Sequence, residues 1–174
     1  MKWTADLELL ALLPAHKEAF HRGREHLAAL LAVAIPDGWP QFPEAFDLPA
    51  PSGIPALPDL TNAEWPAYLF IWRGGSTLVG SGGFAGPPDT GGVVEIGYEI
   101  APTLRNRGLA TRAAETMLKS AFRHPQVRAV VAHTLAEENA SNAVLRKVGM
   151  VFVGELPNTE VGKVWRWELR RQDQ

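Results

Sequence analysis

The sequence predicts one α/β domain in which a mixed, mainly antiparallel β-sheet is flanked by helices. Three strand-like runs, residues 67–73, 77–84 and 93–100, are separated by Gly- and Pro-rich turns, as in an antiparallel meander. Residues 109–122 then carry a broad apolar stripe with helical spacing. A chain of 174 residues with 46% hydrophobic content can bury roughly 70% of its unfolded surface around one core. We therefore expect residues 1–174 to form a single domain.

The N-terminal region has a helical pattern from residue 14 to residue 34. Pro14 suits the first turn of a helix, apolar residues recur on a loose face, and residues 36–38 break the pattern. Gly23 weakens the middle of this run, so the region is expected to form two helices.

A proline-rich loop follows. Residues 35–58 hold seven of the fourteen prolines together with Trp39, Phe42 and Phe46, which favours an ordered loop over a flexible linker. These aromatic side chains either fill the core or, in a functional interpretation, line a substrate pocket. Trp39 and Phe42 are the candidates for substrate binding.

The C-terminal third is expected to add three strands to the sheet, with a short helix between the first two. Residues 127–134 are predicted as a buried strand, and the helix after it should run to Val148 with Gly149 as its C-cap. Residues 150–156 and 163–170 are predicted as a hairpin, since the second segment alternates apolar and charged side chains.

The composition excludes several kinds of function. Without cysteine there is no disulfide, no catalytic thiolate and no cysteine-ligated zinc. A formal net charge of −2 argues against a nucleic-acid-binding surface. His16, His21 and His26 recur every five residues and so turn to different sides of a helix, and no metal site is expected. No apolar run approaches the ~20 residues that span a bilayer, and no export signal is seen. We expect a cytoplasmic protein without membrane contact, as a monomer or homodimer.

The segment Arg105-Asn106-Arg107-Gly108-Leu109-Ala110 joins a predicted strand to a predicted helix. The first backbone N–H groups of such a helix have no partner within it and form a site for an anion. Arginines beside them favour a phosphate or pyrophosphate. The chain contains no Walker motif, and its glycine cluster at residues 74–83 leads into strand-like sequence. Neither nucleotide-loop pattern therefore explains the segment.

Arg105, Gly108 and Ala110 occupy the defined positions of the pattern Q/R-x-x-G-x-G/A, and in this the chain resembles the GNAT N-acetyltransferase superfamily. Residues 94–100 resemble the fourth strand of that family. Residues 139–150 resemble its second motif, a short helix that ends in Gly-Met or Gly-Phe. The similarity is closest in style to the branch of ribosomal-protein alanine N-acetyltransferases.

The resemblance implies a GNAT-like sheet of about six or seven strands, with residues 6–12 as the first. In the family, the basic turn holds the pyrophosphate of coenzyme A (CoA). The fourth strand splays at a bulge beside the next strand, which admits the pantetheine arm. The implied cosubstrate is acetyl-CoA, with no metal. Residues implied in its binding, largely through their backbone, are Glu99, Ile100, Ala101, Arg105, Asn106, Arg107, Gly108, Leu109, Ala110, Thr111 and Asn139.

Acetyl transfer to an amine needs the amine neutral, although α-amino groups titrate near ~8 and lysine near ~10. By resemblance to relatives that carry Glu at the start of Glu-Ile-Gly-Tyr, Glu95 is the candidate general base, acting through water. The alternative is that Glu95 only pairs with a cation. Glu99 lies on the same strand face and is expected at the surface or in acceptor binding. A structural role is favoured for His133.

Many relatives place a Tyr after the Leu of the second-motif helix as the acid that protonates the leaving thiolate. This chain has Arg146 after Leu145. Ser141, positioning a water or the thiol, is the remaining catalytic candidate. Asn139 either binds the pantetheine amide or is a simple helix N-cap.

These features predict an enzyme. It would be an acetyl-CoA-dependent N-acetyltransferase that moves an acetyl group to a primary amine, on a protein N-terminus or a small molecule, by direct nucleophilic attack. The alternative is a non-catalytic acyl-CoA-binding or sensing module, which the missing Tyr favours and Glu95 opposes.

Overall fold

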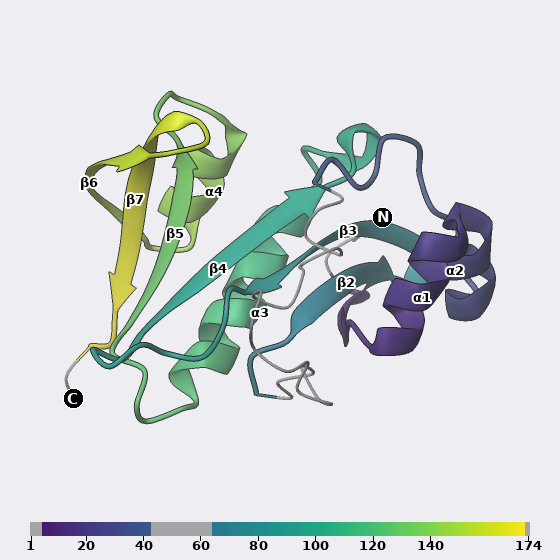
Figure 1. Ribbon diagram of the computed structural model, residues 1–174, viewed down its shortest axis with the longest axis horizontal. Helices are drawn as coiled ribbons and strands as arrows, with labels where there is room; N and C mark the ends of the chain where they lie inside the picture. The colour runs from purple at the N-terminus through teal and green to yellow at the C-terminus, as the bar shows by residue number, and fades with distance from the viewer. Residues whose placement is uncertain (1–4, 43–63, 173–174) are drawn as a thin grey trace.

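The computed structural model describes residues 5–42 and 64–172, which contain one sheet of seven strands in the order β1-β2-β3-β4-β5-β7-β6 (Figure 1). β4 and β5 are parallel, and all other neighbouring pairs are antiparallel. This confirms the mixed, mainly antiparallel sheet. The strands are β1 (Leu7–Ala11), β2 (Ala67–Trp72), β3 (Thr77–Phe84), β4 (Val93–Ile100), β5 (Ala129–Leu135), β6 (Val151–Asn158) and β7 (Gly162–Arg170). The helices are α1 (Pro14–Arg22), α2 (Arg24–Leu31), α3 (Leu109–Phe122) and α4 (Ala140–Lys147), with short 3₁₀-helices η2 (Arg73–Gly75) and η3 (Pro102–Leu104).

The two faces of the sheet bury separate cores. One core lies between the sheet and α3 and includes Ile96 of β4 and Met117 of α3. The other lies between the sheet and the α1–α2 pair and includes Leu27 of α2 and Leu69 of β2. We call these sides the α3 face and the α1 face. Because side chains alternate along a strand, the even-numbered residues of β4 point to the α3 face and the odd-numbered ones to the α1 face.

The N-terminal helical region divides at Gly23, as predicted. Gly23 has φ 131°, a conformation that glycine adopts without a Cβ clash. Its N–H bonds the carbonyls of Ala19 and Phe20 and so ends α1. Phe46, named in the sequence pattern, lies outside the described residues.

The glycines of β3 allow a close approach of β4. A Cβ at Gly80 would lie 2.2 Å from the carbonyl oxygen of Glu99, and one at Gly82 would lie 2.4 Å from that of Gly97. Any larger residue would push the two strands apart. Glycine in this strand therefore keeps β4 in register with β3 instead of forming a phosphate loop.

The C-terminal elements follow the prediction closely. α3 has the predicted limits, and β6 and β7 form the closing hairpin. α4 ends differently: Val148 is the C-cap, and Gly149 follows it with φ 87°. Within residues 5–42 and 64–172, no helix has the length and apolar content needed to cross a bilayer.

Candidate functional site

β4 and β5 separate halfway along their length. They pair only from Val93 with Ala129 to Glu95 with Val131. Beyond that point β4 stays with β3 and β5 with β7, so the two carboxyl ends diverge (Figure 1). The predicted opening is therefore present. It does not come from a bulge in β4, because the β3–β4 register runs unbroken from Ile96 to Ile100.

The edge of β4 that faces the opening carries unpaired backbone groups. The N–H of Ala101 bonds the carbonyl of Val79 on β3, and the carbonyl of Glu95 accepts from Ala85 on the same side. Backbone groups alternate in direction along an antiparallel strand, so the N–H groups of Tyr98 and Ile100 point to the opening. Of the predicted backbone contacts, the N–H of Ile100 therefore faces the opening, whereas the N–H of Ala101 is bonded to β3. The N–H of Glu99 points away by the same alternation.

The basic turn lies at the N-terminus of α3. Asn106 and Gly108 have φ 60° and 77°, and Gly108 is the N-cap of the helix without a side-chain cap. The first N–H groups of a fourteen-residue helix are therefore open to an anion. Residues 105–108 are exposed, while Leu109 is buried and fixes the start of the helix. Gly108 is needed for the backbone conformation itself, apart from any ligand.

The arginines of the turn are partly engaged within the protein. Arg105 donates from Nε to the carbonyl of Ile100 at 3.3 Å and from its guanidinium to the side-chain oxygen of Gln41. Arg112 lies 3.8 Å from Glu115. Arg105 thus links the basic turn to the end of β4 and to the loop before residue 43.

Glu95 and His133 form a contact across the start of the opening. His133 Nδ1 lies 2.7 Å from Glu95 Oε1, and the two side chains are 24% and 44% exposed. Both residues lie on the α1 face, on adjacent strands. Glu95 therefore contacts a histidine for which the sequence had favoured only a structural role.

Glu99 is buried, so the expected surface position is wrong. Its side chain is only 9% exposed and accepts from the N–H of Gln41 at 2.8 Å and from the hydroxyl of Ser81 at 3.4 Å. The indole N–H of Trp39 donates to Ser81 Oγ at 3.1 Å. Trp39 is 6% exposed and Phe42 56%, so the two predicted pocket residues lie in different environments. Trp39 anchors the loop, and only Phe42 is open to a ligand.

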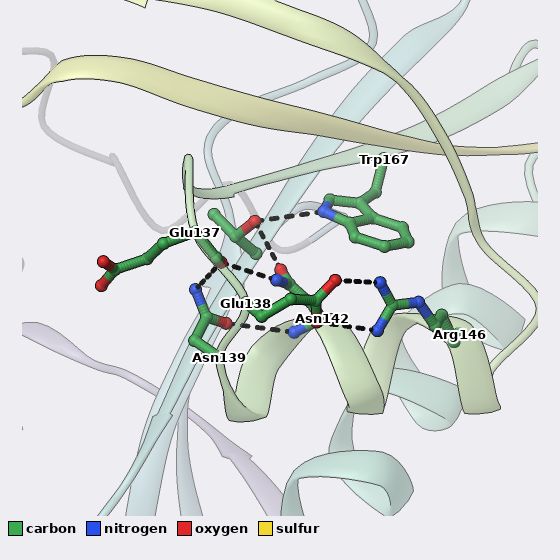
Figure 2. A network of polar contacts seen from close by, with 7 residues as sticks. Glu137, Glu138, Asn139, Asn142, Arg146 and Trp167 are labelled. Carbon is green, nitrogen blue, oxygen red and sulfur yellow. Dashed lines mark hydrogen bonds and ion pairs between the residues drawn. The ribbon is translucent and has the colours of Figure 1, made fainter.

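The β5–α4 connection is held by a local network of amide side chains (Figure 2). Asn139 N-caps α4 by accepting from the N–H of Asn142 at 3.2 Å, and it donates to the carbonyl of Glu137 at 3.1 Å. Asn142 is fully buried and contacts the same carbonyl and Thr134. The N-cap interpretation of Asn139 is therefore confirmed. One hydrogen of its amide group remains for a ligand.

Arg146 does not point to the opening. Its guanidinium binds the carboxylate of Glu138 at 2.6 and 3.1 Å and stacks 5.1 Å from the ring of Trp167 (Figure 2). Five residues after Ser141, it lies about 140° around the helix from that serine. Leu145 lies within about 40° of Ser141 and is buried. An acid sharing the direction of Ser141 would therefore stand at Leu145.

Tyr98 lies on the α3 face beside Ser141. Its hydroxyl oxygen is buried, and among the described residues none gives it a hydrogen bond of normal geometry. Burial raises the pKa of Tyr98, an effect that the nearby Ser141 hydroxyl partly opposes. Sequence reasoning could not find this neighbour, because the two residues are 43 positions apart and come together only in the fold.

The described residues contain no group of three His, Asp or Glu side chains arranged to hold a metal. The family described as "Acetyltransferase (GNAT) domain" matches residues 54–151, and the chain belongs to this family. An uncharacterized N-acetyltransferase of Bacillus subtilis (strain 168) is 26% identical over 86 residues, 49% of this chain and 51% of the relative. The chain thus spans about half the length of that curated relative.

Two of the similar solved structures share the fold over nearly the whole chain, and a third shares it over part of the chain. A ribosomal L7/L12 alpha-N-protein acetyltransferase in complex with coenzyme A has a TM-score of 0.65 at 18% identity and covers 95% of this chain and 94% of its own. A spermidine N-acetyltransferase chimera from Vibrio cholerae has a TM-score of 0.64 at 18% identity, with 95% of both chains covered. A GNAT-family acetyltransferase from Bacillus anthracis is 25% identical, with a TM-score of 0.53 over 60% of this chain and 65% of its own.

Proposed function

We propose that the protein is an acetyl-CoA-dependent N-acetyltransferase that acetylates a primary amine by direct nucleophilic attack. The observation that carries the proposal is the separation of β4 and β5 after Glu95. The opening joins the α3 face, where the basic turn lies, to the α1 face, where Glu95 lies. A cosubstrate on one face and an acceptor on the other can meet there without a covalent enzyme intermediate, for which this chain offers no cysteine.

The residues at the opening fit acetyl-CoA. The uncapped start of α3 and the exposed arginines suit a pyrophosphate, and the outward N–H groups of Tyr98 and Ile100 suit carbonyl oxygens. Ser141 of α4 lies beside Tyr98, whose N–H faces the opening, and Asn139 caps the start of the same helix. Bound acetyl-CoA would supply an activated acyl group. The chain contributes binding at the turn, orientation by these backbone donors, and a negative charge at Glu95 for deprotonation of the amine.

The α1 face has room for an acceptor beside Glu95. Gly97, the next odd-numbered residue of β4, is exposed, and a Cβ there would meet none of the described atoms within 4 Å. A primary amine fits this position between the carboxylate and the opening. The solved neighbours include enzymes named for a ribosomal protein and for spermidine, so peptide α-amines and polyamines are the first acceptor classes to test.

The test is a turnover screen that measures free-thiol release from acetyl-CoA with peptides of different N-terminal residues, polyamines and aminoglycosides. We expect thiol release that depends on the amine, with the acetylated product visible by mass spectrometry. Tight CoA binding without turnover of any amine in the panel would instead support a non-catalytic acyl-CoA-binding or sensing module. The observation that favours this second function is that Arg146 stacks on Trp167 and points away from the opening.

A further inference from the structure

The contact between Glu95 and His133 has a defined direction. Nδ1 of the imidazole faces the carboxylate at 2.7 Å. Within the part of the chain that the structure describes, this is the only polar contact of the His133 ring, so Nε2 has no partner there. The side chain is 24% exposed, which leaves Nε2 within reach of a ligand on the α1 face.

The strand register explains why these two residues meet. Glu95 pairs with Val131 at the last paired position of β4 and β5. His133 follows Val131 by two residues, so its side chain points to the same face and lies beside the space that opens above Glu95. The pair therefore marks the point where the α1 face reaches the opening, next to exposed Gly97.

Glu95 is the acidic side chain in contact with His133, because the nearby Glu168 is engaged with two arginines. Arg166 lies directly across on β7 and is engaged with Glu168 at 3.5 Å, and Arg170 binds the same carboxylate at 2.5 Å. Glu168 thus neutralises arginine charge on β7. Glu95 Oε1 is placed to accept a proton carried on Nδ1 of His133, and in that tautomer Nε2 is the basic atom of the ring.

We propose that His133 is the catalytic residue that takes the proton from the acceptor amine, at Nε2, and that Glu95 is the positioning residue that orients it. The proposal rests on the proposed function and refines its base. The N–H bond of the acceptor ammonium breaks and an H–Nε2 bond forms, while the electron pair stays on the amine nitrogen. The imidazolium is balanced by the Glu95 carboxylate and returns its proton to solvent after the turnover.

The first test is independent of activity. The ¹⁵N shifts of His133 are measured by NMR in the full-length protein at alkaline pH, in the wild type and in Glu95→Ala. The expected wild-type tautomer carries its proton on Nδ1, and Glu95→Ala should lose that preference because the acceptor is gone. An Nε2–H tautomer in the wild type would overturn the proposal even if no acceptor amine were known.

The second test compares kcat/KM for His133→Gln, Glu95→Ala and the double variant, with exposed His26→Gln as a matched control. Each single change should lower kcat/KM by about 10²–10⁴-fold without weakening acetyl-CoA binding. The double variant should be no worse than either single one, because the residues act as a unit. Glu95→Asp, with a shorter carboxylate, should recover part of the rate.

A His133→Gln rate within about threefold of the wild type, alongside a large loss in Glu95→Ala, would overturn the proposal and leave Glu95 as the base. Failure of the proposed function looks different. In that case the wild type releases no thiol with any amine, while the NMR tautomer still decides whether the pair exists as described.

Discussion

The two faces of the sheet that meet at the β4–β5 opening are built in different ways. On the α3 face, the proposed anion site is made by one continuous segment, residues 105–110 at the start of α3. On the α1 face, the side-chain contacts of Glu95 and Glu99 join distant parts of the chain. His133 is 38 residues from Glu95, and Glu99 binds Ser81 and Gln41, which are 18 and 58 residues away.

This difference separates the expected effects of mutation. A change in the basic turn on the α3 face should act first on CoA binding, because that proposed site is a local backbone structure. A change on the α1 face should act on the rate or on stability, because the carboxylates there depend on strand register and loop packing. A turn variant that changes only the rate, or a variant of Glu95 or Glu99 that changes only CoA binding, would break the comparison.

The largest expected effect distinguishes the two carboxylates of β4. Glu95→Gln should lower kcat/KM by about 10²–10⁴-fold and leave acetyl-CoA affinity unchanged, and higher pH should partly restore the rate because more amine is neutral. Glu99→Gln should change the rate much less. It should lower the free energy of unfolding by about 1–2 kcal/mol, since the buried carboxylate accepts two hydrogen bonds. Initial rates, calorimetric titration and urea unfolding measure these quantities, and equal rate losses would contradict the distinction.

The next effect tests the local nature of the anion site. Gly108→Val should weaken CoA binding at least about tenfold, measured by titration calorimetry. Because Gly108 has φ 77°, any side chain there also strains the backbone. Gly162→Val is the matched control, since Gly162 has φ 86° and a Cβ there would meet no described atom within 4 Å. If both variants lost similar affinity, backbone strain and not the anion site would be the cause.

The same comparison explains how much the sequence could predict. The limits of α3, the strands of the meander and hairpin, and the basic turn follow from short-range periodicity and turn residues, whereas β1 and the number of strands were expected from the family resemblance. The burial of Glu99 could not be foreseen, because it requires Trp39, Gln41 and Ser81 to come together from two other segments. The contact of Glu95 with His133 needed the register of β4 and β5. With that register known, the two-residue spacing between Val131 and His133 would have placed His133 on the same face as Glu95.

The place of the Tyr general acid that this chain lacks shows a second limit of prediction from the sequence. Counting one residue after Leu145 selects Arg146, but the helix turns that residue toward Glu138 and Trp167. The sequence gives the order of residues in α4, and their direction depends on which side of α4 packs on the sheet.

A third prediction therefore compares two positions on α4. Arg146→Tyr should leave turnover nearly unchanged, because the side chain points away from the opening. Ser141→Ala should lower turnover about tenfold, the value of one hydrogen bond in the transition state, and leave CoA affinity close to that of the wild type. A gain of activity in Arg146→Tyr would show that position 146 does reach the opening.

The smallest expected effect concerns Tyr98. Its side chain lies on the α3 face, although the same strand carries Glu95 and Glu99 on the α1 face. Tyr98→Phe removes a buried hydroxyl that has no hydrogen bond of normal geometry among the described residues, so the free energy of unfolding should rise by about 1 kcal/mol. If the hydroxyl donates to the leaving sulfur together with Ser141, turnover should fall about fivefold. The diagnostic result is a protein that is more stable and slower. A rise in stability with an unchanged rate would make Tyr98 a packing residue only.

The pH dependence of Tyr98 gives this last prediction a second measurement. Burial raises the pKa of Tyr98 above its ordinary value of 10.0, so the folded state keeps the phenol proton more firmly than the unfolded chain does. The unfolded state therefore loses its proton first, and wild-type stability should fall as pH rises above about 10. The free energy of unfolding of Tyr98→Phe, measured by urea unfolding, should fall less steeply over that range.

The rate should respond differently to pH. Below about pH 10 the phenol stays neutral, so the ratio of the wild-type rate to the Tyr98→Phe rate should not change with pH. If this rate ratio varied between about pH 7 and 9, the Tyr98 hydroxyl would ionise during the reaction, which would contradict its role as a neutral hydrogen-bond donor.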